Sequence, residues 1–369
     1  MAVYTAIDDP EAYFQAKLYS GTGSQLAVTL DGDTDMQPDF VWFKNRGTTN
    51  SHGLQDSVRG FDTTGIQSTN GTDADPAFDG STLGYVSAVG SDGFTVEAGN
   101  CANASSNNYV AWCWKAGTAF SNDASATSIG TIDSSGSASD TAGFSIVSYT
   151  GNATNGATVA HGLSSAPQMV ITKNRADAGT SWQVLTNIYP SYSEGDYIYL
   201  SSTQAKANSA NVSFLPTSTT WQMESGQAGN VASTQIAYCF AEKQGFSKFG
   251  SYTSNFSSDG VFVYLGFRPA FVMVKSSSAA GTNWVVHDNK RHSVTPASGG
   301  TNFNVINRQS MPNLNNADDT NDGIDFLSNG FKWRWTGGDV NSTAGRTYIY
   351  MAFAEAPFVN SNGVPCNAR

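Results

Sequence analysis

The chain has 369 residues, more than one ordinary hydrophobic core organises and suited to two or three domains. Charged residues make up 13% and the net charge is -11, which argues against a nucleic-acid partner because phosphates require clustered Lys and Arg. Aromatic residues reach 12%, and apolar runs alternate with Gly, Asn, Asp and Ser, a pattern typical of short β-strands joined by turns.

The N-terminal stretch MAVYTAIDDPEAYF has neither a basic segment nor an apolar core, so no signal peptide is predicted. No apolar stretch approaches the ~20 residues of a membrane helix. We therefore expect no membrane partner and folding in a reducing cytoplasm.

Three stretches of the chain repeat the same landmarks in the same order. Each has a proline, an apolar strand and a lysine six residues after the proline, and each closes with a second apolar strand. The lysine strands are Pro38–Lys44, Pro167–Lys173 and Pro269–Lys275, and the closing strands are Val110–Trp114, Ile236–Phe240 and Ile349–Phe353. Matched landmarks in one chain predict internal duplication of a structural unit.

Each unit is roughly 100–110 residues long, the size of one β-sandwich and not of a short solenoid repeat. The sequence therefore predicts an all-β protein of three tandem antiparallel β-sandwich domains, of jelly-roll or lectin-like type. The expected boundaries are 1–117 for the first repeat, 143–244 for the second and 245–358 for the third, with a Ser/Gly-rich linker at 118–142 and a C-terminal tail at 359–369.

The two joints between repeats differ in composition. Residues 118–142 have few apolar anchors and are typical of a flexible linker, whereas almost nothing separates the second and third repeats. We expect the second and third repeats to be rigidly coupled and the first to be more loosely tethered.

The four cysteines show no pattern of metal ligands. Cys113 and Cys239 occupy the same repeat position, where the third repeat has Ala352, so a small buried slot is expected there. Cys101 and Cys366 are isolated. We expect packing roles, no disulfide and no bound metal.

Two acidic loops are candidate calcium sites. The loop that begins at Asp31 resembles the start of an EF-hand, but Met36 and Trp42 stand where Gly and Glu are needed. The acidic loop 318–322 allows the same two interpretations, a solvated turn or a calcium site. Solvated turns are the favoured interpretation, and an irregular calcium site is the alternative.

Asp56 and Arg59 in the first repeat correspond to Asp288 and Arg291 in the third. The second repeat has Thr186 and Tyr189 instead. Two copies of an Asp/Arg pair indicate an ion pair that stabilises a turn. The alternative is a repeated corner that contacts a ligand or a subunit.

The sequence contains no recognisable catalytic or cofactor motif. It has no His-Glu-x-x-His, no Gly-x-Ser-x-Gly, no P-loop and no dinucleotide fingerprint, so no enzyme activity and no cofactor are expected. Trp335 stands where the earlier repeats have Ala98 and Ser225. It is interpreted as the edge of the core or, alternatively, as an exposed platform for a sugar or a neighbouring subunit.

The chain resembles the tandem-repeat virion structural proteins of marine and freshwater tailed phages, of the cyanophage and pelagiphage type. The matching segments are Ile7–Phe14, Pro38–Arg46, Asp56–Gly60, Gly143–Gly151, His161–Leu163, Val285–Arg291 and Tyr348–Phe358. The resemblance implies a virion component that assembles in the host cytoplasm, and it implies no catalytic residue. A homo-oligomer is left open as a further partner.

Three functional hypotheses follow. The first is a non-enzymatic virion structural protein that decorates or cements the capsid, or forms a tail-associated knob or fibre, with other virion proteins as partners. The second is a lectin-like tail protein that recognises host-surface glycans. The third, ranked last, is a depolymerase that works through two opposed carboxylates.

Overall fold

The computed structural model describes residues 4–75, 80–225, 229–291, 305–320 and 323–366. It confirms the all-β class, because nearly all of its regular elements are strands and every named ladder between them is antiparallel. Three short helical turns complete the list of elements: η1 (Pro10–Ala12), α1 (Gly80–Leu83) and α2 (Ala124–Thr127). No helix among the described residues is long and apolar enough to cross a membrane.

The strands of the first repeat form two sheets. One has the order β1-β7-β3-β4 and the other β2-β6-β5. Their bounds are β1 Phe14–Ser20, β2 Leu26–Thr29, β3 Phe40–Asn45, β4 Gly53–Asp56, β5 Val86–Gly90, β6 Gly93–Val96 and β7 Asn108–Trp114.

The strands of the second repeat also form two sheets. An eight-stranded sheet has the order β15-β14-β13-β12-β17-β10-β9-β8, and β11 pairs with β16. The bounds are β8 Thr118–Asn122, β9 Ser134–Ser139, β10 Phe144–Thr150, β11 Ala157–Ala160, β12 Met169–Asn174, β13 Gln183–Thr186, β14 Asp196–Tyr199, β15 Ala207–Asn208, β16 Thr220–Met223 and β17 Thr234–Phe240.

The third repeat again has a pair of sheets, ordered β18-β25-β20-β21 and β19-β24-β23-β22. The bounds are β18 Ser247–Thr253, β19 Phe262–Tyr264, β20 Phe267–Ser276, β21 Val285–Asp288, β22 Val305–Ile306, β23 Ile324–Leu327, β24 Gly330–Trp333 and β25 Thr347–Pro357.

The same four-strand arrangement therefore occurs three times, as β1-β7-β3-β4, β10-β17-β12-β13 and β18-β25-β20-β21. The registers match residue by residue: Lys44, Lys173 and Lys275 lie opposite Val110, Ile236 and Ile349, respectively. The landmarks that align in the sequence are therefore equivalent positions in the sheets. We call these four-stranded arrangements the main sheets.

The linker prediction is wrong. Residues 118–142 include β8 and β9, which extend the main sheet of the second repeat beyond β10. The Ser, Gly and Ala residues of β9 form backbone ladders with β8 on one side and β10 on the other. At Gly136 an added Cβ would lie 1.8 Å from Ile146 O, so only glycine fits there. The small residues of this segment allow close strand packing and do not indicate a flexible linker.

Each main sheet of the first two repeats is buried on both faces. In β7, Ala111 and Cys113 face the interior of their own sandwich, whereas Val110, Trp112 and Trp114 belong to a core shared by all three repeats. The second repeat divides in the same way, with Cys239 inside the sandwich and Tyr238 in the shared core. Alternation along each strand thus serves two different cores.

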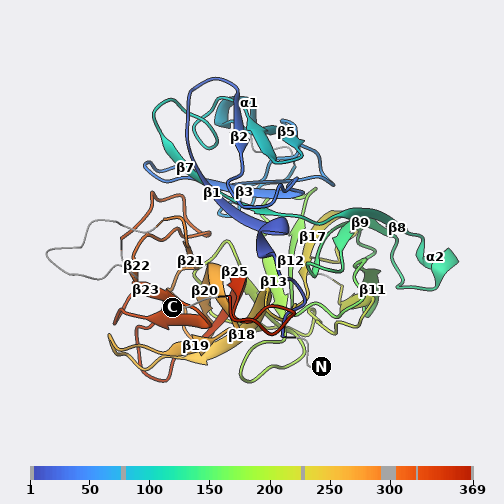
Figure 1. Ribbon diagram of the computed structural model, residues 1–369. Helices are drawn as coiled ribbons and strands as arrows, with labels where there is room; N and C mark the ends of the chain where they lie inside the picture. Colours follow the sequence, from blue (N-terminus) through green and yellow to red (C-terminus); the bar gives the residue numbers. More distant parts are fainter. Residues whose placement is uncertain (1–3, 76–79, 226–228, 292–304, 321–322, 367–369) are drawn as a thin grey trace, which may run out of the picture.

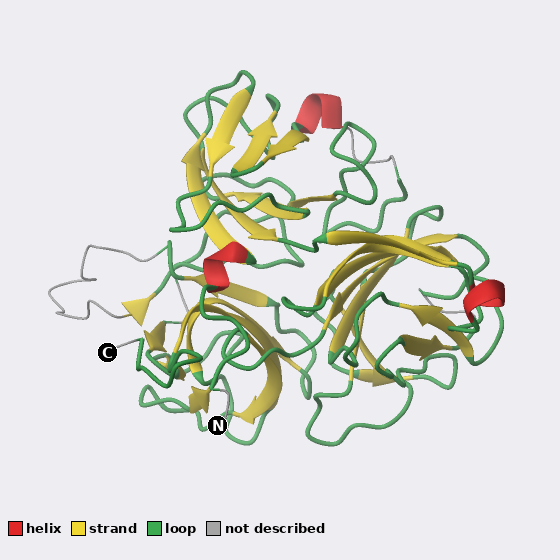
Figure 2. Ribbon diagram, turned by 45° about the vertical axis from the view of Figure 1, so that its right-hand side comes forward, coloured by secondary structure: helices red, strands yellow, loops and turns green. Residues whose placement is uncertain are grey.

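Aromatic rings from the three repeats meet in this shared core. Trp114 and Phe353 have ring centroids 5.5 Å apart, and those of Phe240 and Phe353 are 6.0 Å apart. These three residues occupy the same repeat position. Figures 1 and 2 show the resulting three lobes around a common centre. The expectation of a loosely tethered first repeat is therefore wrong, because its main sheet supplies part of the central core.

Candidate functional site

The first Asp/Arg pair lies in a buried turn at the end of β4. The Asp56 carboxylate accepts hydrogen bonds from the backbone amides of Val58 (3.0 Å) and Arg59 (2.8 Å) and from Arg59 Nε (2.6 Å). Arg59 Nη2 also donates to Leu54 O. Both charged side chains are fully buried. The pair holds a tight turn, as the ion-pair interpretation predicts.

This turn also contacts the second repeat. Tyr238, on β17, donates its hydroxyl to Asp56 Oδ2 at 2.7 Å and accepts a hydrogen bond from Arg59 Nη2 at 3.1 Å. A carboxylate, a guanidinium and a phenol are thus hydrogen-bonded to one another away from water. Because removal of either charged member leaves the other without its closest partner, the three groups act as one structural unit.

The second Asp/Arg pair has the same geometry at the end of β21. Asp288 accepts from the backbone amides of Lys290 and Arg291 and from Arg291 Nε at 2.7 Å. Here the neighbouring repeat supplies Trp112, whose Nε1 donates to Asp288 Oδ2 at 2.9 Å. The Arg291 guanidinium also lies 5.2 Å from the centroid of the Trp112 ring, a cation–π contact.

A second acid extends each pair. Asp318 forms ion pairs with Arg291 Nη1 (2.8 Å) and with Arg46 Nε (2.9 Å) of the first repeat. Burial acts to raise the pKa of Asp318, but the charge of Arg291 and the contacts with Arg46 and Ser310 outweigh it and hold that pKa below its usual value. The carboxylate therefore stays ionised and joins two repeats.

The equivalent acid in the first repeat is Asp75. It forms ion pairs with Arg175 of the second repeat and with Arg59 Nη1, at 3.8 Å. Arg46 and Arg175 are themselves equivalent, since each follows the last residue of β3 or β12. The interface between repeats 1 and 3 and the interface between repeats 2 and 1 are therefore built from the same set of groups.

The third interface is less charged. Thr186 and Tyr189 replace the Asp/Arg pair, and Met351 occupies the strand position of Trp112 and Tyr238. A thioether carries no hydrogen-bond donor, so this position makes no demand for a carboxylate. The absence of the pair from the second repeat thus agrees with the apolar side chain on the strand.

Two kinds of hydrogen bond to backbone carbonyl oxygens occur at all three interfaces between repeats. Ring nitrogens of His52, Trp182 and Trp284 each bond a carbonyl oxygen of the neighbouring repeat: Met311 O at 3.1 Å, Ser68 O at 2.8 Å and Tyr199 O at 2.9 Å. The backbone amides of Asp318, Asp75 and Lys206 donate to the carbonyl oxygens of Arg46, Arg175 and Ser277. Repeat 1 thus contacts repeat 3, repeat 3 contacts repeat 2, and repeat 2 contacts repeat 1, which closes a ring.

The repeated lysines are buried beside these interfaces. Lys44 Nζ donates to Asn45 O, and Lys275 Nζ to Thr282 O, both at 2.6 Å, while Lys173 Nζ donates to Asn174 O at 2.8 Å. Burial lowers the pKa of each of the three ammonium groups to about 8. Their donors are used by carbonyl oxygens and hydroxyls of the chain, so these lysines are structural.

The remaining sequence candidates fall into three environments. Cys113 and Cys239 are fully buried, and burial raises the pKa of both thiols, as expected for packing residues. Asp31 lies in ion pairs with Lys17 and Lys290. Within the described ranges no group of three His, Cys, Asp or Glu side chains could hold a metal ion. Part of the second acidic loop, residues 321–322, lies outside the described residues.

Trp335 is exposed, with 43% of its surface accessible, while the neighbouring Phe331 and Trp333 are buried. It follows β24, and its carbonyl oxygen accepts a hydrogen bond from Asn341 Nδ2 at 3.0 Å. The structure does not bring Trp335 together with either Asp/Arg pair. Its side chain is therefore part of the surface, and its role as a platform stays a prediction.

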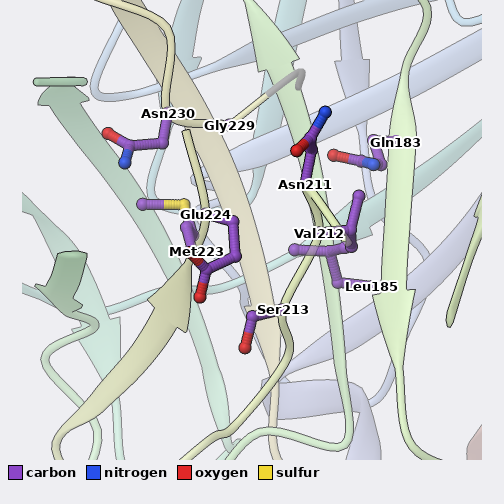
Figure 3. Close-up of a pocket in the computed structure, with 9 residues that line it drawn as sticks. All are labelled: Gln183, Leu185, Asn211, Val212, Ser213, Met223, Glu224, Gly229 and Asn230. Carbon is purple, nitrogen blue, oxygen red and sulfur yellow. The ribbon is translucent and has the colours of Figure 1, made fainter. Parts of the chain in front are cut away.

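A small cavity lies within the second repeat (Figure 3). Its lining includes Gln183, Asn211, Met223 and Glu224, and its volume is about 10 Å³. This is room for about one water molecule. Gln183 Nε2 is buried there without a protein partner, which suits a water and not a larger ligand.

The fold and these contacts define a multi-sandwich β protein whose buried charges hold its repeats together. The chain belongs to the family described as domain of unknown function DUF7483, which matches residues 9–357 and so includes all three repeats. No curated protein and no solved structure matches the chain.

The sequence identified the Asp/Arg pairs but not what they contact. A signal for their partners was present in the sequence. Trp112 and Tyr238 occupy the same repeat position, where the third repeat has Met351, and the interface that lacks the Asp/Arg pair is the one that contains this methionine. Asp75 and Asp318 carried no such signal, because they lie in loops of different length.

We predict that Asp56→Asn destabilises the chain by about 3–5 kcal/mol, because the buried Arg59 cation loses its close carboxylate partner and keeps only Asp75, at 3.8 Å. Tyr238→Phe should cost about 1–2 kcal/mol, and the double variant should cost less than the sum because the groups share bonds. Urea unfolding measures all three. Asp259→Asn is the control: this carboxylate is exposed and ion-paired with Lys332, so a change below about 1 kcal/mol is expected. A loss below about 1 kcal/mol in Asp56→Asn would contradict the structural role.

Acid should destabilise the fold through its buried histidines. Burial lowers the pKa of His52 well below its usual value, that of His161 to about 4 and that of His287 to about 3. The unfolded chain takes up these protons near pH 6.5, whereas the folded chain does not. The free energy of unfolding is therefore unaffected by the histidines above that pH and decreases as the pH falls below it. The expected slope is about 1.4 kcal/mol per pH unit for each histidine. Urea unfolding between pH 7 and 4.5 gives the slope of the free energy of unfolding against pH. This slope should be smaller in His161→Gln by the contribution of one histidine, and an unchanged slope would reject this account.

Proposed function

We propose that this protein is a non-enzymatic structural component of a phage particle, exposed on its surface. The observation that carries the proposal is the closed ring of buried contacts between repeats. The Asp/Arg pairs, the repeated lysines and His52 all make structural contacts at or beside these interfaces. We therefore assign these groups to stability and not to chemistry. The resemblance to virion proteins supports the same role.

A decoration or cement role on the capsid fits this architecture better than a slender fibre. The three lobes form a compact body around one centre (Figure 2), and no long helical or coiled-coil shaft occurs among the described residues. Such a body suits a knob or a cap that binds other virion proteins. A tail-associated appendage of the same shape is the alternative location.

Cryo-electron microscopy of purified particles of a phage that encodes this chain tests the proposal. We expect density for the three-lobed body at a fixed copy number on the outer surface, and the chain should be found in those particles by mass spectrometry. Its absence from purified particles would overturn the proposal.

Glycan recognition is a second candidate function, favoured by the distribution of exposed aromatic rings. The exposed aromatic residues of the described chain are Tyr4, Phe256, Phe262, Tyr264 and Trp335. Four of these five lie in the third repeat, although the three repeats share one plan, so among the described residues that repeat exposes more aromatic surface than the other two. A glycan array tests this function as such, and no signal above background would reject it.

A further inference from the structure

A cleft of about 550 Å³ lies beside two of these aromatic residues, Tyr4 and Tyr264. It lies between the joint that leads into β18, the end of β19 and the segment that follows β25. Its lining includes Tyr4, Glu242, Gln244, Lys248, Tyr264 and Phe358. The volume lies in the range of small-molecule sites, in contrast to the water-sized cavity beside Gln183.

Both ends of the described chain are fastened beside this cleft. Ala6 N donates to Gln244 O at 2.9 Å, and Phe358 N donates to Gly266 O at 3.2 Å. Ser361 N donates to Asp8 Oδ1 at 2.7 Å, which ties the two terminal segments together. The walls are therefore held in place without a ligand, and a preformed site loses less free energy on binding.

Gly245 permits the closest of these approaches. Its φ is 79°, a conformation that other residues rarely adopt, and an added Cβ would lie 2.3 Å from Thr5 Oγ1. Only glycine lets the N-terminal segment pack directly against the joint. The joint between the second and third repeats thus forms one wall of the cleft.

Two tyrosines give the cleft exposed aromatic surface. Tyr4 is 52% accessible and Tyr264 is 57% accessible. Phe262 precedes Tyr264 by two residues on β19 and is also exposed, but it does not line the cleft. Flat rings of this kind pack against the C–H faces of sugar rings, and a phenol adds a hydrogen-bonding group.

The polar groups of the cleft offer both donors and acceptors without net charge. Glu242 Oε1 and Lys248 Nζ lie 3.5 Å apart, and both side chains are about one-third exposed. Glu242 Oε2 accepts a hydrogen bond from Phe249 N at 3.3 Å, which positions the carboxylate. An anion would meet Glu242, and a purely apolar ligand would leave this ion pair without water.

We propose that this cleft binds a neutral carbohydrate of one or two sugar rings, with Tyr264 and Tyr4 stacking on the sugar and Glu242 and Lys248 bonding its hydroxyls. A polyhydroxylated ring is the ligand class that presents apolar faces and many neutral donors and acceptors together. The proposal rests on the glycan-binding candidate and gives it a site. It does not depend on where the chain lies in a particle.

The test measures binding of maltose, lactose, cellobiose and chitobiose to the purified full chain by saturation-transfer NMR and by calorimetric titration. We expect at least one disaccharide to bind. Tyr264→Ala should weaken that binding by about tenfold, because a stacked aromatic contact is worth roughly 1 kcal/mol or more. Glu242→Gln should also weaken it. Phe262→Ala is the matched control and should bind as the unsubstituted chain does.

The outcomes separate the site from the function. Loss of binding in Trp335→Ala with full binding in Tyr264→Ala would overturn the cleft but leave glycan recognition in place. Failure of all four sugars, or binding of the anionic aromatic dye anilinonaphthalene sulfonate in the cleft without any sugar, would overturn the proposal. Circular dichroism of each variant confirms that a loss is not caused by unfolding, since Tyr264 is exposed.

Discussion

The structure depends on main sheets that cannot be left open on either face. A β-sandwich needs only one apolar face per sheet, yet β7 carries Trp112 and Trp114 on the face that points away from its sandwich. Exposure of such large side chains would forfeit about 1.5–3 kcal/mol for each of them. Each main sheet must therefore be covered from outside, and the other two repeats provide that cover. The ring of three lobes follows from this constraint.

Polar contacts then fix the arrangement that hydrophobic burial alone would leave loose. Apolar surfaces can slide past one another, but His52, Trp182 and Trp284 each bond one particular carbonyl oxygen of the next repeat. The buried Asp/Arg pairs act in the same way, since an unpaired buried charge penalises any other register. The charges of this chain are few, and those inside it set geometry.

Internal comparison of the sequence predicted the strands and their equivalence because alternation and turn residues are local signals. Cys113 was correctly predicted as a packing residue from Cys239 and Ala352 at the same position. The linker was wrong because backbone pairing, and not side-chain character, holds β9 between β8 and β10. The contacts of Asp75 with Arg175 and of Asp318 with Arg46 could not be predicted, since they depend on how separate repeats meet, which no local pattern records.

The central claim is that the repeats share one core and are not independent domains. Differential scanning calorimetry of the full chain tests it most directly. A shared core predicts one cooperative transition, with the calorimetric enthalpy equal to the van't Hoff enthalpy of the whole chain. Two or more separable transitions, each with the enthalpy of a single repeat, would contradict it.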